Sequence, residues 1–381
     1  MTPSIPFIDL KAQQDRIRPQ IDAAIKRVLD RGAYIMGPEV KELEQKLAEF
    51  CGVKHVITCA NGTDALQLAL MAKKVSVGEA VFVPSFTFAA TAEVVALLGT
   101  TPFFVDVLPD TYNMDPNSLE VGISKALNLG LKPKGVITVD LFGQPADYDE
   151  IQAVADRHDL WIIADAAQSF GAMYKGRRVG NIGDIATTSF FPAKPLGCYG
   201  DGGAVFTNDD NLAGIVRSLA VHGKGSEKYD NIRIGVNSRL DTIQAAIILE
   251  KLNVFPDEIV ARQRLADRYN DALEDLVGTP QVIPDVSSVW AQYTVRLPKG
   301  VDRGALMADL KAAGVPTMIY YVKPLHQQEA FNKFPVAGAN GLPVSETLAR
   351  HVLSLPMSGY VDGDSLERII GKLSNWFNNH Q

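Results

Sequence analysis

The sequence predicts an α/β fold in which a largely parallel sheet lies between helices, followed by a smaller α+β unit. Short β-rich runs alternate with helical stretches between residues 56 and 207, a pattern typical of strand–helix units with parallel strands. Several of these runs are apolar on both alternating faces, as strands buried on both sides should be. After about Asp241 the strand and helix patterns become fewer and less regular, which indicates a second unit.

Seven β-rich runs are expected to form one mostly parallel sheet. They are Val56–Cys59, Ala80–Val83, Pro102–Val105, Gly135–Leu141, Leu160–Ala164, Thr187–Phe191 and Ala204–Thr207.

Helices are predicted where apolar residues recur at three- and four-residue steps. Two of them precede the first strand and are separated by a loop at residues 32–38 that holds glycine and proline. The others lie between strands. The predicted helices are Ile21–Leu29, Val40–Phe50, Thr63–Lys73, Ala89–Leu98 and Tyr148–His158.

The second unit begins with a long helical stretch, Ile243–Leu276, that is expected to be interrupted near Phe255 and Pro256. A strand-like run, a helix, a short segment and a final helix follow, at Trp290–Leu297, Arg303–Ala313, Pro316–Tyr321 and Asp364–Phe377. We therefore divide the chain into a large α/β domain with an N-terminal arm, residues 1–245, and a small C-terminal α+β domain, residues 246–381.

Composition excludes several classes of protein. Hydrophobic residues make up 46% and charged residues 21% of the 381 residues, as in ordinary globular proteins and unlike disordered chains. The formal net charge of −7 does not suit general nucleic-acid binding. Cys51, Cys59 and Cys198 cannot form a disulfide framework, and no signal peptide, membrane span or metal-ligand spacing is found. We expect a cytoplasmic protein without a metal.

The most specific segment for chemistry surrounds Lys194. A strand leads into a loop in which Pro192 and Pro195 flank this lysine, and four glycines follow within nine residues. Glycines allow a ligand to approach the backbone closely. A lysine that is fixed and partly desolvated has a lowered pKa and can form a Schiff base with a carbonyl group. A lone loop lysine is more often a solvated charge, but this context favours the functional interpretation.

Further candidates follow other predicted strands. Asp165 lies at the carboxyl end of an apolar strand, where open α/β sheets bind ligands, although it could simply cap a helix. Gln168 is one helical turn further on. The segment with Gly62 and Thr63 opens a helix and suits a phosphate, with Ser189 as another donor, or it could be a plain strand-to-helix turn.

Phe88, also near a strand end, could stack on a flat ring or pack in the core. A lysine, a carboxylate, a phosphate cradle and an aromatic platform from successive strand ends fit one cofactor, pyridoxal 5′-phosphate (PLP).

These motifs make the sequence resemble the DegT/DnrJ/StrS group of sugar-nucleotide aminotransferases, which are fold-type I PLP enzymes. The resemblance extends over nearly the whole chain, from residues 7–10 to residues 354–357. The stretches that carry it include residues 37–40, 60–66, 84–91, 165–169, 189–194, 200–203 and 235–246.

The resemblance implies a role for each matching residue. Lys194 would form the Schiff base and carry the proton, and Asp165 would pair with the pyridinium nitrogen. The other cofactor contacts it implies are Gln168 to the ring hydroxyl, Gly62, Thr63 and Ser189 to the phosphate, Phe88 to the ring, and Asn237 to the phosphate of a neighbouring subunit. On the substrate side it implies Arg239 and Tyr321, and we add Tyr320 and His326, although a structural role is favoured for His326.

The sequence departs from the family in two places. It has Tyr320-Tyr321-Val322 where a histidine-tyrosine-proline stretch is usual, and Ser358 where a histidine often stands. Both positions bear on sugar recognition. Lys194 itself argues against relatives that replace the lysine with histidine and remove a hydroxyl group.

The resemblance implies a cytoplasmic homodimeric transaminase with its active site at the subunit interface. L-Glutamate would donate the amino group and leave as 2-oxoglutarate, and a nucleotide-linked keto sugar would accept it. The closest match is to enzymes that aminate C3 of a UDP-linked 3-keto-hexuronic acid for bacterial surface polysaccharides such as lipopolysaccharide O-antigen. The alternatives are a dTDP-linked 3- or 4-keto-6-deoxyhexose, a non-catalytic PLP-binding regulator, and a PLP enzyme that uses Cys198.

Overall fold

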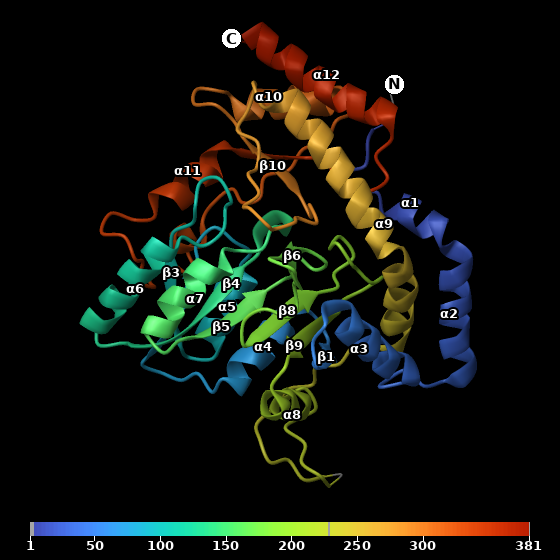
Figure 1. The fold of residues 1–381 in the computed structure, drawn as a ribbon, viewed down its shortest axis with the longest axis vertical. Coiled ribbons are helices and arrows are strands. Elements are labelled where there is room, and N and C mark those ends of the chain that lie inside the picture. The colour runs from blue at the N-terminus through green and yellow to red at the C-terminus, as the bar shows by residue number, and fades with distance from the viewer. Residues whose placement is uncertain (1–3, 228, 381) are drawn as a thin grey trace.

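A twisted seven-stranded sheet with helices on both faces forms the centre of the molecule (Figure 1). The computed structural model describes residues 4–227 and 229–380. The strand order is β1-β9-β8-β5-β4-β2-β3. The strands are β1 (His55–Cys59), β2 (Glu79–Pro84), β3 (Thr101–Val105), β4 (Lys132–Val139), β5 (Trp161–Asp165), β8 (Ile185–Ser189) and β9 (Gly203–Thr207).

All seven predicted strands are confirmed, and the sheet is mostly parallel. Only β9 runs against its neighbours, because it pairs antiparallel with both β1 and β8. Strands β2 and β9 are buried at every position, so both faces of the sheet are covered, as their apolar sequences predict. The carboxyl ends of β1, β2, β4, β5 and β8 consequently lie at the same edge of the sheet.

All five helices predicted before and between the strands are confirmed, with small differences at their ends. The helices of the large unit are α2 (Arg18–Arg31), α3 (Pro38–Cys51), α4 (Gly62–Ala72), α5 (Ala90–Leu97), α6 (Pro116–Asn128), α7 (Tyr148–Arg157) and α8 (Asp210–Leu219), with the short α1 (Leu10–Arg16) before them. Helices α1, α6 and α8 were not predicted from the sequence. Nor was a small hairpin of β6 (Met173–Tyr174) and β7 (Arg177–Arg178).

One predicted feature of the second unit is wrong. Helix α9 (Thr242–Leu273) runs without interruption through Pro256. Proline lacks an N–H and usually kinks a helix, so it was read as a break. Here Phe255 and Leu265, on either side of the proline, are both buried. Their packing outweighs the cost of the backbone hydrogen bond that Pro256 cannot make.

The second unit is a two-stranded antiparallel sheet with helices. Strand β10 (Tyr293–Arg296) pairs with β11 (Val352–Leu355), and these elements are accompanied by α10 (Arg303–Ala312), α11 (Pro343–His351) and α12 (Gly363–His380). In Figure 1, α10 and α12 lie at the end of the molecule away from α8. The strand and the two helices predicted here are confirmed within a few residues, whereas β11 and α11 were not predicted.

Two apolar cores underlie this arrangement. The larger surrounds the seven-stranded sheet and includes Phe255 of α9, whereas the second surrounds β10 and β11 and includes Leu265 and Tyr269 of the same helix. Helix α9 therefore belongs to both. The predicted division between residues 245 and 246 falls within its first turns, and it stays a prediction.

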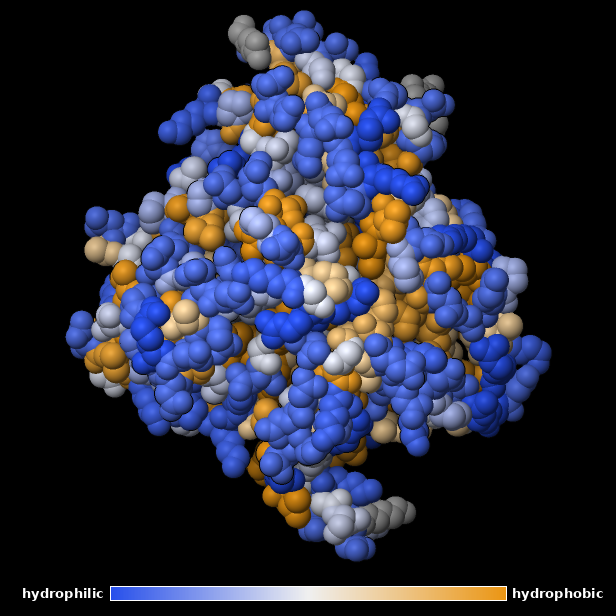
Figure 2. All heavy atoms as spheres, in the orientation of Figure 1, coloured by the Kyte–Doolittle hydropathy of each residue, from blue (hydrophilic) through white to orange (hydrophobic). Residues whose placement is uncertain are grey.

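The surface is polar over most of the face shown in Figure 2. Apolar residues gather toward the centre right of that view and on the loop that protrudes below α8. That loop includes Ile232 and Ile234, which are exposed. Within the described ranges, no helix has both the length and the apolar character that crossing a membrane requires.

Candidate functional site

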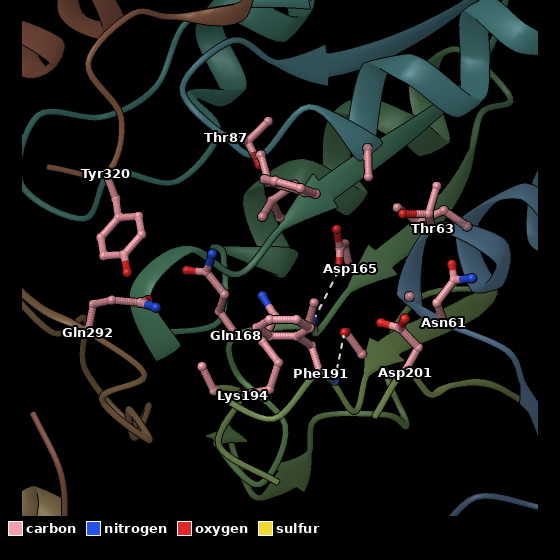
Figure 3. Close-up of a pocket in the computed structure, with 18 of the residues that line it drawn as sticks. Asn61, Thr63, Thr87, Asp165, Gln168, Phe191, Lys194, Asp201, Gln292 and Tyr320 are labelled. Atoms are coloured by element: carbon pink, nitrogen blue, oxygen red, sulfur yellow. Dashed lines mark hydrogen bonds between the residues drawn. The ribbon is translucent and has the colours of Figure 1, made fainter. Parts of the chain in front are cut away.

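A cavity of about 780 Å³ opens at the carboxyl edge of the sheet, where parallel α/β folds bind ligands. Its size is typical of small-molecule sites. The cavity gathers residues that follow β1, β2, β5 and β8 along the chain. Nine residues named from the sequence line it: Gly62, Thr63, Phe88, Asp165, Gln168, Ser189, Tyr320, Tyr321 and Lys194 (Figure 3).

Lys194 lies in the loop after β8, partly buried, and its backbone N–H donates to the carbonyl of Phe191 at 2.8 Å. Glycine is required in the turn that follows, because a Cβ at Gly197 would lie 2.5 Å from the Phe191 carbonyl oxygen. Burial lowers the pKa of the Lys194 amine, while the Asp165 carboxylate raises it. The net direction is downward, which favours a neutral, nucleophilic amine.

Asp165 ends β5 and is buried. Its Oδ1 accepts a hydrogen bond from the Ala167 N–H at 3.0 Å, which fixes the direction of the carboxyl group. Burial raises the pKa of Asp165, and both this hydrogen bond and the charge of Lys194 act in the opposite direction. A buried carboxyl group of this kind is stabilised as an anion when a cation such as a protonated ring nitrogen lies next to it.

A second buried carboxyl group lies behind Asp165. Asp140 accepts hydrogen bonds from Ser169 Oγ and Tyr148 Oη, both at 2.7 Å, and its own N–H donates to the Asp165 carbonyl at 3.1 Å. Burial raises the pKa of Asp140 to about 7. The sequence analysis did not identify this residue, because it follows β4 without any motif.

The start of α4 forms a tight cradle. Asn61 caps the helix, with its Oδ1 accepting from the Asp64 N–H at 2.8 Å. A Cβ at Gly62 would lie 2.6 Å from the Cβ of Ser189, so glycine is needed for β8 and α4 to approach each other here. The helix N-terminus, Thr63 and Ser189 are thereby brought to one end of the cavity, and such an end suits a phosphate group.

Gln168 and the two tyrosines form another wall. Gln168 Oε1 accepts from the Phe142 N–H at 2.7 Å, and its Nε2 donates to Tyr321 Oη at 3.2 Å. Burial raises the pKa of the Tyr321 hydroxyl, which keeps it neutral and able to donate. Phe88 lines the cavity and is 57% exposed, so the structure does not use it as a core residue.

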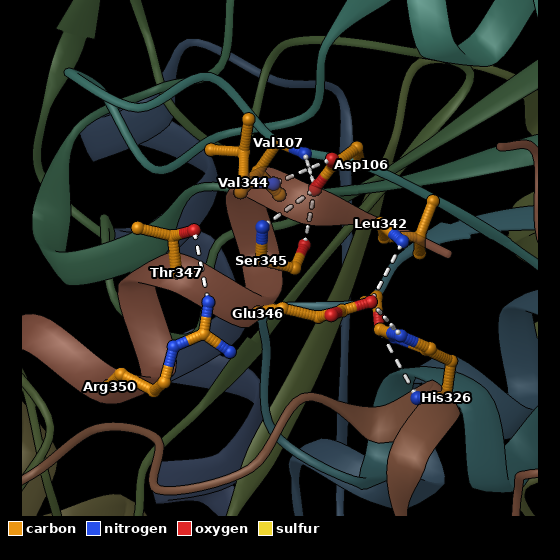
Figure 4. A network of polar contacts seen from close by, with 10 residues as sticks. Asp106, Val107, His326, Leu342, Val344, Ser345, Glu346, Thr347 and Arg350 are labelled. Atoms are coloured by element: carbon orange, nitrogen blue, oxygen red, sulfur yellow. Dashed lines mark hydrogen bonds and ion pairs between the residues drawn. The ribbon is translucent and has the colours of Figure 1, made fainter. Parts of the chain in front are cut away.

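Three of the named residues do not line this cavity. Asn237 is exposed and Arg239 is half-buried, on the segment that leads into α9. His326 contacts Ser85 Oγ through Nδ1 at 2.6 Å. Its Nε2 contacts Glu346 Oε1 at 3.2 Å (Figure 4). Its ring connects the end of β2 to α11, so these contacts favour the structural role over substrate binding.

Several lining residues were not identified from the sequence. Asn61, Thr87, Phe191 and Asp201 stand inside the quoted motifs, so their positions beside the named residues could have indicated them. Gln292 stands in no motif and precedes β10 in the second unit, so only the fold places it at the cavity.

The alternative nucleophile Cys198 is fully buried, and its thiol donates to the carbonyls of Phe190 and Gly200. Burial raises its pKa, so the thiol is a poor nucleophile. Among the residues that the structure describes, no group of three or more His, Cys, Asp or Glu side chains is placed to hold a metal ion.

Comparison with known proteins gives consistent matches. The profile of the DegT/DnrJ/EryC1/StrS aminotransferase family matches residues 15–374. The chain is 52% identical to UDP-2-acetamido-2-deoxy-3-oxo-D-glucuronate aminotransferase of Pseudomonas aeruginosa, over 97% of this chain and 100% of that protein. It is 39% identical to dTDP-3-amino-3,4,6-trideoxy-alpha-D-glucose transaminase of Streptomyces venezuelae, over 98% and 97% respectively.

Solved structures agree with these sequence matches. A DegT DnrJ EryC1 StrS aminotransferase from Brucella abortus superimposes with a TM-score of 0.95 and 54% identity, over 98% of this chain and 99% of that one. A Bacillus subtilis protein with the bound cofactor PMP, the aminated form of PLP, has a TM-score of 0.90 and 28% identity, over 99% and 86%.

Proposed function

The chain belongs to the DegT/DnrJ/EryC1/StrS aminotransferase family, and from this premise we propose that it transfers an amino group from L-glutamate to C3 of a UDP-linked 3-keto-hexuronic acid. It is an aminotransferase, and PLP is its cofactor. The observation that carries the choice of sugar is the 52% identity, over nearly the whole of both chains, to a relative named for a UDP-3-oxo-glucuronate.

The residues at the cavity fit PLP. The start of α4, where the absence of a Cβ at Gly62 lets the helix approach Ser189, suits the phosphate, with Thr63 and Ser189 as donors. Asp165, buried at the end of β5, suits the ring nitrogen, and Lys194 has a lowered pKa that suits a bond to the carbonyl carbon. We assign these four residues, together with Gly62, to cofactor binding. Bound PLP supplies an electron sink for the pair left when the α-proton departs.

The protein's own groups then have distinct tasks. Lys194 Nζ, when it is not bonded to the cofactor, would take the α-proton of the amino donor and return it to the carbon on the other side of the transferred nitrogen, for which an amine with a lowered pKa is suited near neutral pH. Asp165 keeps the ring nitrogen protonated, held in place by the Ala167 N–H. Asp140 carries no direct task here, but its backbone N–H supports the end of β5.

A homodimer with shared active sites is the second part of the proposal. Among the described residues that line the cavity, Lys194 is the only lysine or arginine, although a nucleotide-linked uronate brings several negative charges. Arg239 and Asn237, which lie outside this chain's cavity, would supply contacts to the site of a second subunit. Exposed apolar residues beside the cavity and the α9 N-terminus support such a contact: Phe88, Phe191, Tyr34, Ile35 and Met36.

The cellular role follows from the substrate. A nucleotide-linked amino uronate is a building block for bacterial surface polysaccharides, including lipopolysaccharide O-antigen. We place the protein in the cytoplasm, where thiols stay reduced. The three cysteines of the chain are free and buried, which agrees with that location.

The experiment runs the reaction in reverse. Purified enzyme in the PLP form is mixed with UDP- and dTDP-linked amino sugars, and the absorbance change of the cofactor is followed with and without 2-oxoglutarate. We expect the UDP-linked 3-amino-uronate to react fastest. A faster reaction with a dTDP-linked amino-6-deoxyhexose would replace our choice with the alternative that the Streptomyces venezuelae relative represents.

The same preparation separates an enzyme from a PLP-binding regulator. L-Glutamate should convert the cofactor spectrum to that of the aminated form, because Lys194 and Asp165 are both present. A bound cofactor that does not respond to L-glutamate or to any amino sugar would contradict the catalytic role.

A further inference from the structure

Three amide side chains line the cavity, and two of them are fixed by the protein itself. Asn61 Oδ1 accepts from the Asp64 N–H at 2.8 Å, and Gln168 Oε1 accepts from the Phe142 N–H at 2.7 Å. Gln292 is different. It is only 8% exposed, it lines the cavity, and its Oε1 accepts no hydrogen bond within the described part of the chain.

The backbone beside Gln292 is held tightly. Its N–H donates to the Phe142 carbonyl at 3.3 Å, and the Val289 N–H donates to the Gly143 carbonyl at 3.0 Å. Gly143 has a φ of 118°, and a Cβ there would lie 2.6 Å from the Trp290 nitrogen. The turn at Phe142 and Gly143 therefore fixes both the side chain of Gln168 and the main chain of Gln292.

The position of Gln292 in the cavity indicates what it can reach. In Figure 3, Gln292 and Tyr320 lie at one end, Asn61, Thr63 and Asp201 lie at the other, and Lys194 lies between the two ends. The end with Thr63 is the proposed phosphate cradle. Gln292 consequently lies beyond the reactive lysine, on the side where a substrate would extend.

We propose that Gln292 is a specificity-determining residue that binds the sugar of the nucleotide-linked substrate, which deepens the proposed function and rests on it. A buried acceptor without a donor is unfavourable, so a ligand that donates to it gains affinity. A sugar offers hydroxyl groups and, where it is N-acetylated, an amide N–H. L-Glutamate offers only carboxylate acceptors besides its reacting amine. Rotation about the broad terminal torsion of the amide brings its oxygen to such a donor.

The test compares the two half-reactions in Gln292→Met, which keeps the length of the side chain and removes the amide. We expect kcat/KM for the amino sugar to fall by about 5- to 100-fold, the range for one buried hydrogen bond. The half-reaction with L-glutamate should fall much less. The control is Gln327→Met, an exposed glutamine of the same unit that does not line the cavity, and it should match the wild type in both.

Equilibrium binding gives an independent readout. Titration of the aminated enzyme with the nucleotide-linked amino sugar should show a weaker Kd for Gln292→Met by a similar factor. A substrate analogue that lacks the 2-acetamido group then identifies the donor. If the N–H binds Gln292, the wild type discriminates between the two sugars and the variant does not; if a hydroxyl binds it, the variant is weaker toward both.

Two results overturn the inference. One is an unchanged reaction of Gln292→Met with the amino sugar, and the other is an equal loss in both half-reactions, which would indicate a general effect on the cavity. Gln292→Ala replaces the first variant if that one does not load the cofactor. A wild-type enzyme that reacts with no nucleotide-linked amino sugar refutes the proposed function itself, whereas a reactive wild type beside an unaffected variant refutes only the role of Gln292.

Discussion

Replacing Gly62 with alanine tests the phosphate cradle most directly. The new Cβ would lie 2.6 Å from Ser189 Cβ and 3.2 Å from Ser189 Cα, which is main chain of β8. Strand β8 cannot move freely, since it pairs with both β5 and β9. The N-terminus of α4 and Ser189 must therefore separate by several tenths of an ångström, and the donors that face the cavity separate with them.

The expected change in the free energy of unfolding is the difference between two opposing effects. Overpacking a tight contact costs about 1–3 kcal/mol, and alanine regains at most about 1 kcal/mol over glycine in a helix. We expect the apoenzyme to lose about 0–2 kcal/mol of its free energy of unfolding. The affinity for PLP should fall further, because a hydrogen bond to a charged group contributes about 1.5–3 kcal/mol. Loss of one such bond to the phosphate should raise the Kd of PLP by about 10- to 150-fold.

The assay is a PLP titration of apoenzyme, followed by absorbance, together with urea unfolding of the same sample. Gly214→Ala is the matched control. This glycine lies in α8, and a Cβ there meets no atom within 4 Å. We expect the control to be slightly more stable than wild type and to bind PLP equally well.

Two results would refute this reasoning. If Gly62→Ala binds PLP as tightly as the control, the start of α4 does not hold the phosphate. If the variant unfolds more easily but keeps its PLP affinity, the close approach of Gly62 to Ser189 serves only the packing of helix against strand.

Three further predictions concern Lys194, Asp140 and the dimer. Lys194→Ala should abolish transamination, and mass spectrometry should detect no borohydride labelling at this position. The melting temperature of the variant should stay close to wild type, because the Lys194 amine makes no hydrogen bond or ion pair within the described chain. Near-wild-type turnover would refute the assignment. The pKa of Asp140 is raised by burial to about 7, so the folded state binds a proton that the unfolded state releases above about pH 4, and stability from this group is lost as pH rises toward 7. Asp140→Asn should remove up to about 1.4 kcal/mol per pH unit from the slope of unfolding free energy between pH 4 and 7, and an unchanged slope would show that Asp140 does not titrate there. When Lys194→Ala and Asn237→Ala subunits are mixed, about half of the dimers contain one subunit of each kind, and each such hybrid has one intact site. Activity should therefore return in about a quarter of all sites. If no activity returns, Asn237 does not belong to the site of the neighbouring subunit.

Much of the fold could be predicted because the sheet leaves a strong signal. The central strands β2 and β9 are buried at every position and mostly apolar, and residues with polar side chains follow several strands, so both the strands and the edge with the ligand site could be recognised. The antiparallel direction of β9 could not, because strand direction leaves no mark in the residues themselves. Helices α6 and α8 went unrecognised although Asp115 and Asp209 cap them.

The candidate site was predictable where single residues carry unusual chemistry. Lys194 stands in a loop whose proline and glycine content predicts a fixed geometry, and Asp165 stands at the carboxyl end of an apolar strand. Asp140 and Gln292 have no such signal, because an aspartate after a strand and a glutamine before one are ordinary residues. Their importance comes from long-range folding that buries one behind Asp165 and brings the other across the cavity.

The continuity of α9 limits how the molecule can open for its substrates. A helix of 32 residues spans roughly 48 Å, and its two halves are embedded in different cores. The two cores therefore cannot move apart about a flexible linker. Any such movement must bend α9 at Pro256, the residue inside the helix that has no backbone N–H to donate. The binding and release of bulky sugar nucleotides thus depend on the loops around the cavity. Substitutions that stiffen those loops should slow turnover, whereas substitutions that stiffen the helix should not.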